Sequence, residues 1–288
     1  MTQSNSKVAI VTGANTGIGL ETARGLAQQG YTVVMTARNR EKGERAVADV
    51  QQSTGNLNVD LLDLELSNMA SVRAAAAAFK AKHSQLDLLV NNAGLILSER
   101  STTADGFEST FAINHLGPFL FTQELTDMLV ADAPARVVNL ASEAHRMSPG
   151  LDFDDLMRER RNYAGMSVYG DSKLANILFT RELARRLSDK GVVAHAVHPG
   201  VVRTGFAADG DTKGWFAALV KLGGPFMLSA AGGAKTSLHC ATSDEAGACT
   251  GLYWAKSKKK TPTKAAQDDA AAARLWQASE ALVAAAQA

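Results

Sequence analysis

Tyr169 and Lys173 stand four residues apart in a stretch that predicts the first turns of a helix, Ser167-Val-Tyr-Gly-Asp-Ser-Lys-Leu-Ala-Asn176. Side chains at i and i+4 share one face of a helix, so the phenol and the ammonium group point into the same cleft. This spacing is common by itself, and its significance depends on which other motifs the chain carries.

Proton transfer to or from an oxygen atom is the chemistry that suits this pair. A free phenol has a pKa of about 10, and lowering it to about 7 requires about 4 kcal/mol. One ammonium group about 4 Å away supplies roughly that much at an effective dielectric constant near 20. We therefore expect Lys173 to lower the pKa of Tyr169, so that the phenol acts as a general acid or base near neutral pH.

A second motif, Thr12-Gly-Ala-Asn-Thr-Gly-Ile-Gly19, lies directly after the apolar run Val8–Val11 and opens a predicted helix. Glycines let the backbone approach a pyrophosphate closely, and the free N–H groups of a helix start bind it. The spacing is Gly-x3-Gly-x-Gly, and an ordinary strand–helix turn is the alternative. The flanking strand and helix favour nucleotide binding, with contacts from Gly13, Asn15, Thr16, Gly17, Ile18 and Gly19.

The end of the second predicted strand indicates which dinucleotide binds. An NAD-binding fold places an acidic residue there for the ribose hydroxyls, whereas this chain has Thr36 and Ala37 followed by Arg38. A guanidinium group suits a 2′-phosphate, although Arg38 could also be a solvated residue of a basic loop. We therefore predict NADP(H) in preference to NAD(H).

Acidic side chains for the adenine end of the cofactor follow the third predicted strand, in Leu62-Asp-Leu-Glu-Leu66. Asp63 and Glu65 have the same parity on a strand, so both could face one way, with Leu66 beside them. Either carboxylate could instead sit at a helix start, near the positive end of the helix dipole. Which of the two contacts adenine stays open.

Short apolar runs alternate with longer helical stretches along the chain, a pattern typical of an α/β fold. We predict one Rossmann-type domain over residues 1–288, a doubly wound sheet of about seven mostly parallel strands with helices on both faces. The predicted strands are Val8–Val11, Tyr31–Met35, Asn58–Leu62, Leu86–Val90, Arg136–Leu140, Val192–His198 and Gly251–Tyr253. The predicted helices are Gly17–Gln29, Arg40–Gln51, Ser67–Lys82, Gly106–Val130, Val168–Leu187, Gly232–Cys240 and a C-terminal helix within residues 265–286, packing through Leu275, Trp276 and Leu282.

Two further motifs fall at the carboxyl ends of strands, where parallel sheets bind their ligands. Asn91-Asn-Ala-Gly94 closes the fourth strand, and its small residues would let a cofactor cross the edge through Asn92, Ala93 and Gly94. Ser142 follows the fifth strand. Glu143 and His145 beside it would suit a serine hydrolase, but no Gly-x-Ser-x-Gly elbow surrounds Ser142.

Asn114 lies in a predicted helix among apolar residues, close to Gly117-Pro118. It either satisfies the backbone at a kink there or holds a water through its carbonyl group against Lys173. Its neighbour His115 is interpreted as a packed or hydrogen-bonded histidine rather than as a metal ligand.

The composition argues against several other classes of protein. A formal net charge of +1 gives no reason to expect nucleic acid as a partner, and Lys258-Lys-Lys260 is predicted to be a solvated loop. Cys240 and Cys249 are too few for a disulfide framework or a zinc site, so we expect no metal. No signal-peptide pattern and no apolar run of about 20 residues is present, which favours a cytoplasmic protein without a membrane anchor.

In order and approximate spacing, these motifs resemble the short-chain dehydrogenase/reductase family over nearly the whole chain. The shared elements are Thr12-Gly-x3-Gly-x-Gly19, Asn91-Asn-Ala-Gly94, Asn114, Ser142, Tyr169-x3-Lys173 and His198-Pro-Gly200. The retinol dehydrogenase-like branch is resembled by Ala37-Arg-Asn39, Asn114-His-Leu-Gly117, Leu151-Asp-Phe-Asp-Asp-Leu156, Ser172–Phe179 and Ser237-Leu-His-Cys240.

The resemblance implies a nicotinamide-dependent oxidoreductase whose catalytic tetrad is Asn114, Ser142, Tyr169 and Lys173. Ser142 would then hold the substrate oxygen, and Lys173 would bond the nicotinamide ribose. The implied nicotinamide contacts are Pro199, Gly200, Val202 and Thr204. The family's adenine-side aspartate falls on Glu65, which is a departure. The membrane segment that precedes the domain in many relatives is not matched here, which implies a soluble enzyme.

The stretch around Thr204 bears on the substrate. Residues 201–230 contain apolar segments that suit a lid over a hydrophobic ligand, although Trp215 and Phe216 could simply pack on the core. We hypothesise that the substrate is a small hydrophobic aldehyde, ketone or alcohol.

Two alternative functions and the oligomeric state stay open at this point. A non-catalytic NADP(H) sensor would need no activated tyrosine, and Tyr169-Gly-Asp-Ser-Lys173 also resembles light-dependent reductases of a tetrapyrrole C=C bond. Asn91–Gly94 fits the retinoid-like branch better. The extra segment Leu151–Met166 could cover the long-helix face that relatives use for dimerisation, so a monomer and a homodimer are both open.

Overall fold

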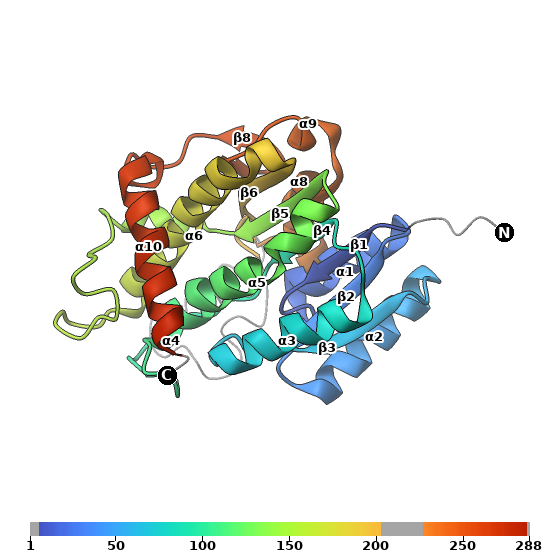
Figure 1. Ribbon diagram of the computed structural model, residues 1–288, viewed down its shortest axis with the longest axis horizontal. Helices are drawn as coiled ribbons and strands as arrows, with labels where there is room; N and C mark the ends of the chain where they lie inside the picture. The colour runs from blue at the N-terminus through green and yellow to red at the C-terminus, as the bar shows by residue number, and fades with distance from the viewer. Residues whose placement is uncertain (1–5, 203–226, 287–288) are drawn as a thin grey trace.

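The protein, described from a computed structural model over residues 6–202 and 227–286, is built on one sheet. Within these residues the sheet has eight strands in the order β3-β2-β1-β4-β5-β6-β7-β8 (Figure 1). Strands β1 to β7 are parallel, and β8 is antiparallel to β7. The strands are β1 Val8–Val11, β2 Thr32–Ala37, β3 Val59–Asp63, β4 Leu88–Asn91, β5 Ala135–Leu140, β6 Val192–His198, β7 Leu252–Ala255 and β8 Lys258–Lys260.

The central strands are apolar along most of their length because both faces of the sheet are buried. Successive side chains of a strand point to opposite faces, and two separate cores result. Ile10 and Leu89 belong to one core, whereas Val11 and Val90 belong to the other. The expected α/β fold with a mostly parallel sheet is therefore confirmed.

One layer of helices covers each face of the sheet. The first layer is α1 Gly17–Gln28, α2 Arg40–Thr54 and α8 Ala230–Thr242, and the second is α3 Met69–Lys82, α5 Gly117–Ala131 and α6 Gly165–Leu187. The shorter helices are α4 Ser109–Phe111 and α9 Asp244–Gly247. Local sequence sets the helix ends, as in α2, where the Asn39 side chain accepts a hydrogen bond from Lys42 N at 2.9 Å and Gly55 ends the helix at φ 71°.

The C-terminal helix α10, Asp269–Ala285, lies across the outer side of α6 (Figure 1). The Trp276 ring packs on Phe119 at 5.0 Å and Phe179 at 5.9 Å, with the Arg186 guanidinium 4.3 Å from its centroid. The expected packing face is thus confirmed, since Leu275 and Trp276 are buried and the half-buried Leu282 packs against the same core. Helix α10 packs on the outer side of α6, and the segment Leu151–Met166 also contacts α6 through the Arg158–Asp171 ion pair; that this segment covers a dimer face stays a prediction.

Two local predictions about elements were wrong. Lys258–Lys260 was expected to be a loop, but it forms the exposed edge strand β8, where lysines discourage pairing with another chain. A single helix was expected over residues 106–130. Instead, α4 passes through a π-helical turn, Ala112–Leu116, before α5 begins.

The order of the strands fixes where a ligand would bind. Strands β1 and β4 are adjacent, but the chain leaves them toward different neighbours, and open parallel sheets bind their ligands at the carboxyl ends of such a strand pair. The glycine-rich turn follows β1 and Asn91–Gly94 ends β4, so both predicted motifs lie at this edge.

Candidate active site

The glycine-rich turn is packed so tightly that a side chain would not fit at its centre. Gly13 and Gly17 have φ values of 61° and 60°, a region that favours glycine. A Cβ on Gly19 would press on the Gly13 carbonyl oxygen and would lie 2.5 Å from Asn92 Nδ2. The turn therefore exposes backbone rather than side chains.

Asn92 ties this turn to the end of β4. Its backbone N–H donates to Thr12 Oγ1 at 2.9 Å, and its Nδ2 donates to the Thr12 carbonyl at 2.8 Å. The Ala93 N–H also donates to Thr12 Oγ1, at 3.0 Å. Within the described part of the chain, Asn92 Oδ1 is buried without a hydrogen-bond partner, which suits a site that receives a polar ligand.

The start of helix α1 is open to an anion. Thr16 is exposed, and its side chain makes no capping hydrogen bond. The first N–H groups of a helix have no partner within the helix, so those of Gly17, Ile18 and Gly19 face the edge with the positive end of the helix dipole. The turn thus fits the diphosphate of a dinucleotide.

Tyr169 and Lys173 lie on one face of α6, as the spacing predicted. Lys173 Nζ lies 5.4 Å from the centroid of the Tyr169 ring and donates to the Leu140 carbonyl at 3.2 Å. Only 3% of Lys173 is exposed. Asn176 Nδ2 donates to the same carbonyl at 2.9 Å. Asn176 was not predicted as a site residue, although its position about one helical turn after Lys173 places it on the same face of α6.

Ser142 faces Tyr169 from the end of β5. Its hydroxyl is hydrogen-bonded to the Tyr169 side chain and accepts from Ala144 N at 3.2 Å. His145 Nδ1 contacts the main-chain oxygen of Ser142 at 2.6 Å rather than the hydroxyl. The serine-hydrolase alternative therefore gains no support from the geometry.

Asn114 connects three elements from the π-helical turn. Its Oδ1 accepts from Leu95 N at 2.8 Å, and its Nδ2 donates to the Leu95 carbonyl and to Ser172 Oγ, both at 2.9 Å. Both side-chain donor hydrogens are therefore used to join the loop after β4 to α6. A π-helical turn is often found at a functional site.

Gly94 lies where these groups converge. A Cβ added there would lie 3.1 Å from Asn114 Oδ1 and 3.2 Å from Lys173 Nζ. The structure thus brings all four residues of the expected tetrad to one edge of the sheet, beside the glycine-rich turn.

The expectation that Lys173 lowers the pKa of Tyr169 was wrong for the protein without its cofactor. Burial raises the pKa of Tyr169 to about 12, and the hydrogen bond to Ser142 only partly opposes this. Burial also lowers the pKa of Lys173 to about 8. In both groups the removal of water favours the neutral form, an effect that the spacing of two residues does not reveal.

The charged residues that follow β2 and β3 differ in whether they have an ion-pair or hydrogen-bond partner. Arg38 is exposed, and the described residues give it no hydrogen-bond or ion-pair partner. Arg40 instead pairs with Asp63 at 2.7 Å and Glu44 at 2.9 Å. Glu65 accepts from Ser67 Oγ at 2.8 Å.

The three residues predicted to border adenine, Asp63, Glu65 and Leu66, also contribute to the stability of the protein without a ligand. Asp63 forms an ion pair, and Glu65 stabilises the turn before α3. Leu66 is buried.

The predicted nicotinamide contacts follow β6 in His198-Pro-Gly200. Gly200 has a φ of 92°, and Val202 forms a parallel bridge with Leu228. A Cβ on Gly233 would lie 2.7 Å from Val202 and 3.1 Å from Ile18, so this loop borders the glycine-rich turn. Thr204, Trp215 and Phe216 lie outside the described residues, as does most of the expected lid 201–230.

His115 is a packed histidine, as predicted. It is buried, its Nε2 lies 2.9 Å from Ser279 Oγ of α10, and burial lowers its pKa to about 3. In the described residues no group of three or more His, Cys, Asp or Glu side chains could hold a metal ion. No helix in the described ranges has the length and apolarity to cross a membrane.

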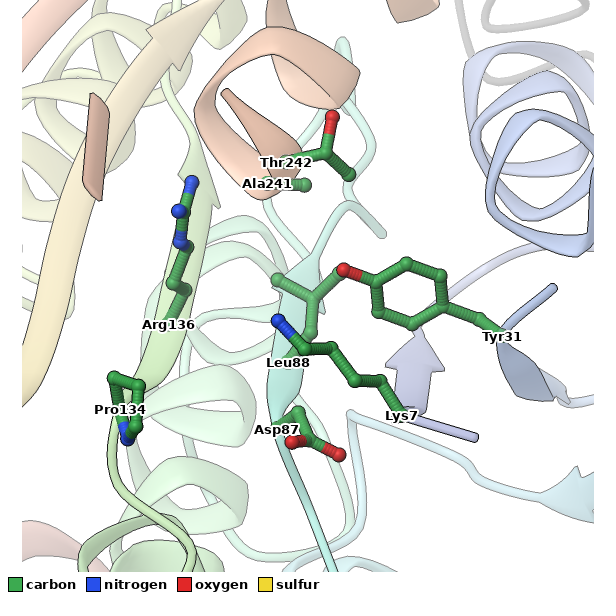
Figure 2. Close-up of a pocket in the computed structure, with 8 residues that line it drawn as sticks. All are labelled: Lys7, Tyr31, Asp87, Leu88, Pro134, Arg136, Ala241 and Thr242. Carbon is green, nitrogen blue, oxygen red and sulfur yellow. The ribbon is translucent and has the colours of Figure 1, made fainter. Parts of the chain in front are cut away.

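A pocket lies at the opposite, amino edge of the sheet (Figure 2). Two of its charged side chains are engaged with neighbouring backbone. Asp87 Oδ2 accepts from Val8 N at 2.7 Å, and Arg136 Nη1 donates to the Ser243 carbonyl at 2.8 Å. The candidate site is therefore the carboxyl edge and not this pocket.

Comparison with known proteins agrees with the site. The sequence model of the family described as short chain dehydrogenase matches residues 7–152 and 157–213. Retinol dehydrogenase 12 of Mus musculus is 44% identical over 277 residues, which are 96% of this chain and 86% of the relative. Retinol dehydrogenase 13 of Homo sapiens is 41% identical over 280 residues, with 96% and 84% covered.

Solved structures share the fold. One from Mycobacterium paratuberculosis, of an uncharacterized protein, has a TM-score of 0.78 and 33% identity, covering 96% of this chain and 93% of that chain. An actinorhodin polyketide ketoreductase variant with NADPH has a TM-score of 0.69 and 25% identity, covering 89% and 97%.

The fold and the site together define a dinucleotide-binding oxidoreductase for alcohol and carbonyl groups. The chain belongs to the short chain dehydrogenase family, and within it to the retinol dehydrogenase-like branch.

A substitution in the glycine-rich turn tests whether it binds a dinucleotide. In Gly19→Ala the new methyl group would collide with the Gly13 carbonyl and Asn92. We expect the dissociation constant for NADPH, measured by fluorescence titration, to rise by at least about 30-fold, or about 2 kcal/mol. Gly55→Ala is the control for lost stability away from the turn, because its φ of 71° strains an alanine while nothing lies within 4 Å of a Cβ there; its NADPH affinity should stay within about twofold. Unchanged affinity in Gly19→Ala would contradict the assignment.

The buried ammonium group of Lys173 has a cost in stability. Its pKa falls from 10.5 to about 8 on folding, so between these pH values the unfolded chain holds a proton that the folded chain lacks. The free energy of unfolding therefore rises with pH in that window, and below it the folded protein carries the full cost.

We expect Lys173→Met, without cofactor, to raise the free energy of unfolding at pH 7 by on the order of 1–3 kcal/mol. Between pH 8 and 10.5 the variant should lose the rise seen in the wild type. Urea unfolding at several pH values measures both effects. A variant less stable than wild type at pH 7 would show that the ammonium is stabilised rather than penalised.

Proposed function

We propose that the protein is an NADP(H)-dependent oxidoreductase that interconverts a hydrophobic alcohol and its aldehyde or ketone, with Tyr169 as the general acid or base. The observation that carries this proposal is the convergence of Tyr169, Lys173 and Ser142 beside the glycine-rich turn. Membership of the short chain dehydrogenase family supports the reaction class.

In the reductive direction, the Tyr169 hydroxyl and the Ser142 hydroxyl donate hydrogen bonds to the substrate carbonyl oxygen. Tyr169 then gives its proton to that oxygen as negative charge develops, and Ser142 stabilises the charge. The bound nicotinamide supplies the hydride. In the oxidative direction Tyr169 first gives its proton to solvent, and the resulting phenolate oxygen accepts the proton of the alcohol.

The charge state of the two buried groups supports their roles. With a pKa raised to about 12, Tyr169 holds its proton at neutral pH and is set to act as an acid. Lys173, with a pKa of about 8, is mostly charged at pH 7 and suits the hydroxyls of the nicotinamide ribose. Asn114 positions α6 and the loop after β4 through its side chain.

The cofactor would lie along the carboxyl edge. We propose contacts from the turn at the diphosphate, from Asn92, Ala93 and Gly94 at the crossing of the edge, and from Pro199, Gly200, Val202 and Thr204 at the nicotinamide. Asp63, Glu65 and Leu66 would border the adenine.

The preference for NADP(H) rests on Arg38. It follows β2 without a partner among the described residues, whereas Arg40 is held by Asp63 and Glu44. Arg38 therefore keeps its donors for a 2′-phosphate. The ketoreductase neighbour was solved with NADPH, which is consistent with this choice.

The substrate class rests on apolar side chains near the site. Met147, Val201 and Leu228 are exposed, and a Cβ on Gly170, next to Tyr169, would lie 3.4 Å from Met147 Cβ. Relatives are named retinol dehydrogenases, and retinol is an apolar alcohol. These relatives favour the alcohol–carbonyl reaction over the sensor and the tetrapyrrole reductase. We retain residues 201–230 as the proposed lid.

Removal of one oxygen atom tests the role of Tyr169. In Tyr169→Phe we expect turnover of NADPH with a panel of apolar carbonyl compounds to fall by about 10²–10⁴-fold, because the proton donor is lost. The dissociation constant for NADPH should stay within about twofold. Near-normal turnover would refute the role, and a preference of the wild type for small charged carbonyls would count against the substrate class.

A charge deletion tests the choice of cofactor. In Arg38→Ala we expect NADPH to bind about 10- to 100-fold more weakly, because a charge-assisted hydrogen bond is lost, while NADH binding is unchanged. Arg45→Ala is the matched control, since Arg45 is an exposed arginine of α2 paired with Glu41. Equal losses in both variants, or equal losses for both cofactors, would contradict a specific contact.

A further inference from the structure

The segment between the Ser142 loop and α6, residues 148–164, is held to the catalytic helix by a buried ion pair. Arg158 Nη2 lies 2.5 Å from Asp171 Oδ2, and the two side chains are 8% and 12% exposed. Asp171 lies between Tyr169 and Lys173 in the sequence of α6. Its second oxygen accepts a hydrogen bond from Ser148 Oγ at 2.6 Å, so the start of the segment and Arg158 meet at this carboxylate.

Arg158 also fastens the first turn of α6. Its Nη2 donates to Ser167 Oγ at 3.0 Å. The residue before the helix, Ala164, supplies no side-chain cap, and an uncapped helix start frays readily. Tyr169 lies only four residues after Gly165, the first residue of the helix, so its position depends on how firmly this first turn is held.

The backbone at Arg158 is itself constrained. Its φ is 51°, which is unfavourable for a residue with a side chain and persists only where the surroundings enforce it. Asp155 enforces it by accepting backbone hydrogen bonds from Glu159 at 2.7 Å and from Arg160 and Arg161 at 3.3 Å. Burial opposes ionisation, but these bonds and the Arg161 side chain lower the pKa of Asp155 to about 2.

The same segment contacts the start of α4, the short helix directly before the turn that carries Asn114. The Tyr163 hydroxyl donates to Glu108 Oε1 at 3.0 Å. Glu108 is fully buried and caps α4 by accepting from Thr110 N at 2.8 Å and Phe111 N at 2.7 Å. Residues 148–164 therefore contact α6, which bears Tyr169 and Lys173, and the start of α4, which continues directly into the turn that bears Asn114.

We propose that residues 148–164 form a brace for the active site, in which Arg158 is a positioning residue that acts through Asp171 and Ser167 to fix the Tyr169 hydroxyl against Ser142. This inference rests on the proposed function of Tyr169. It assigns Arg158 and Asp171 no contact with the substrate or the cofactor. A misplacement of about 1 Å at a reacting group can lower turnover by about 10²-fold, so the brace acts on kcat.

A second buried carboxylate of α6 provides a matched control. Glu182 is 1% exposed in its side chain and pairs with Arg185 at 2.6 Å and Arg186 at 2.7 Å. It lies roughly 13 Å along the helix from Lys173, at 1.5 Å per residue. Glu182→Gln therefore removes an arginine-paired buried charge from the same helix, away from the site.

The experiment compares Arg158→Met, Arg158→Lys, Asp171→Asn and Glu182→Gln in the full chain, with kcat, the KM for an apolar carbonyl, the NADPH dissociation constant and Tm measured for each. For Arg158→Met and Asp171→Asn we expect kcat to fall about 10- to 100-fold with NADPH affinity within about twofold. Glu182→Gln should lower Tm and leave kcat within about twofold of wild type.

Recovery of kcat in Arg158→Lys distinguishes a positioning role of Arg158 from a general effect on stability. One nitrogen of Arg158 makes both bonds to α6, so the lysine of Arg158→Lys can replace it and should restore most of kcat. Asp171→Asn is nearly isosteric and keeps the test informative if Arg158→Met does not fold. Normal kcat in Asp171→Asn, or a loss no larger than in Glu182→Gln at a similar Tm, would overturn the brace.

Tyr169→Phe in the same assay distinguishes failure of the proposed function from failure of the brace. If Tyr169→Phe is active, the proposed function fails. If Tyr169→Phe is inactive while Arg158→Met and Asp171→Asn have normal kcat, only the brace fails.

Discussion

Burial of an ammonium group next to a phenol is the constraint on which the site depends. Lys173 is almost completely buried, and within the described residues it forms no ion pair; its nearest acceptor is the Leu140 carbonyl. Burial favours the neutral form of both Lys173 and Tyr169, and the two pKa values move accordingly. The fold must therefore hold both side chains in place against this penalty, through the long helix α6 packed between the sheet and α10.

Much of this arrangement could be predicted from the sequence because it depends on short-range patterns. The apolar runs predicted seven strands, since a strand buried on both faces has few polar positions. The spacing of Tyr169 and Lys173 predicted a shared helical face, and the turn ending at Gly19 predicted an open helix start. Each of these features depends on neighbours within a few residues of the chain.

Features that depend on distant contacts or on burial could not be predicted in this way. The pKa of Tyr169 depends on how much water the packed fold removes, and the spacing to Lys173 says nothing of this. Asp63 was predicted to contact adenine or to lie at a helix start, and its ion pair with Arg40 was not predicted, because Arg40 is distant in sequence and meets it only after β2 and β3 pair. The strand β8 forms because β7 offers an unpaired edge, whereas three lysines alone favour solvent.

The charges of α6 also explain why the lysine stays free to act. Asp171 is two residues from both Tyr169 and Lys173, and residues at i and i+2 do not face each other on a helix. Arg158 and Ser148 hold its carboxylate on the far side, so it does not neutralise Lys173. Glu182 is likewise occupied by Arg185 and Arg186. Every buried acid of this helix thus has its own arginine, and the cation that faces the site is the one without a counter-charge in the described structure.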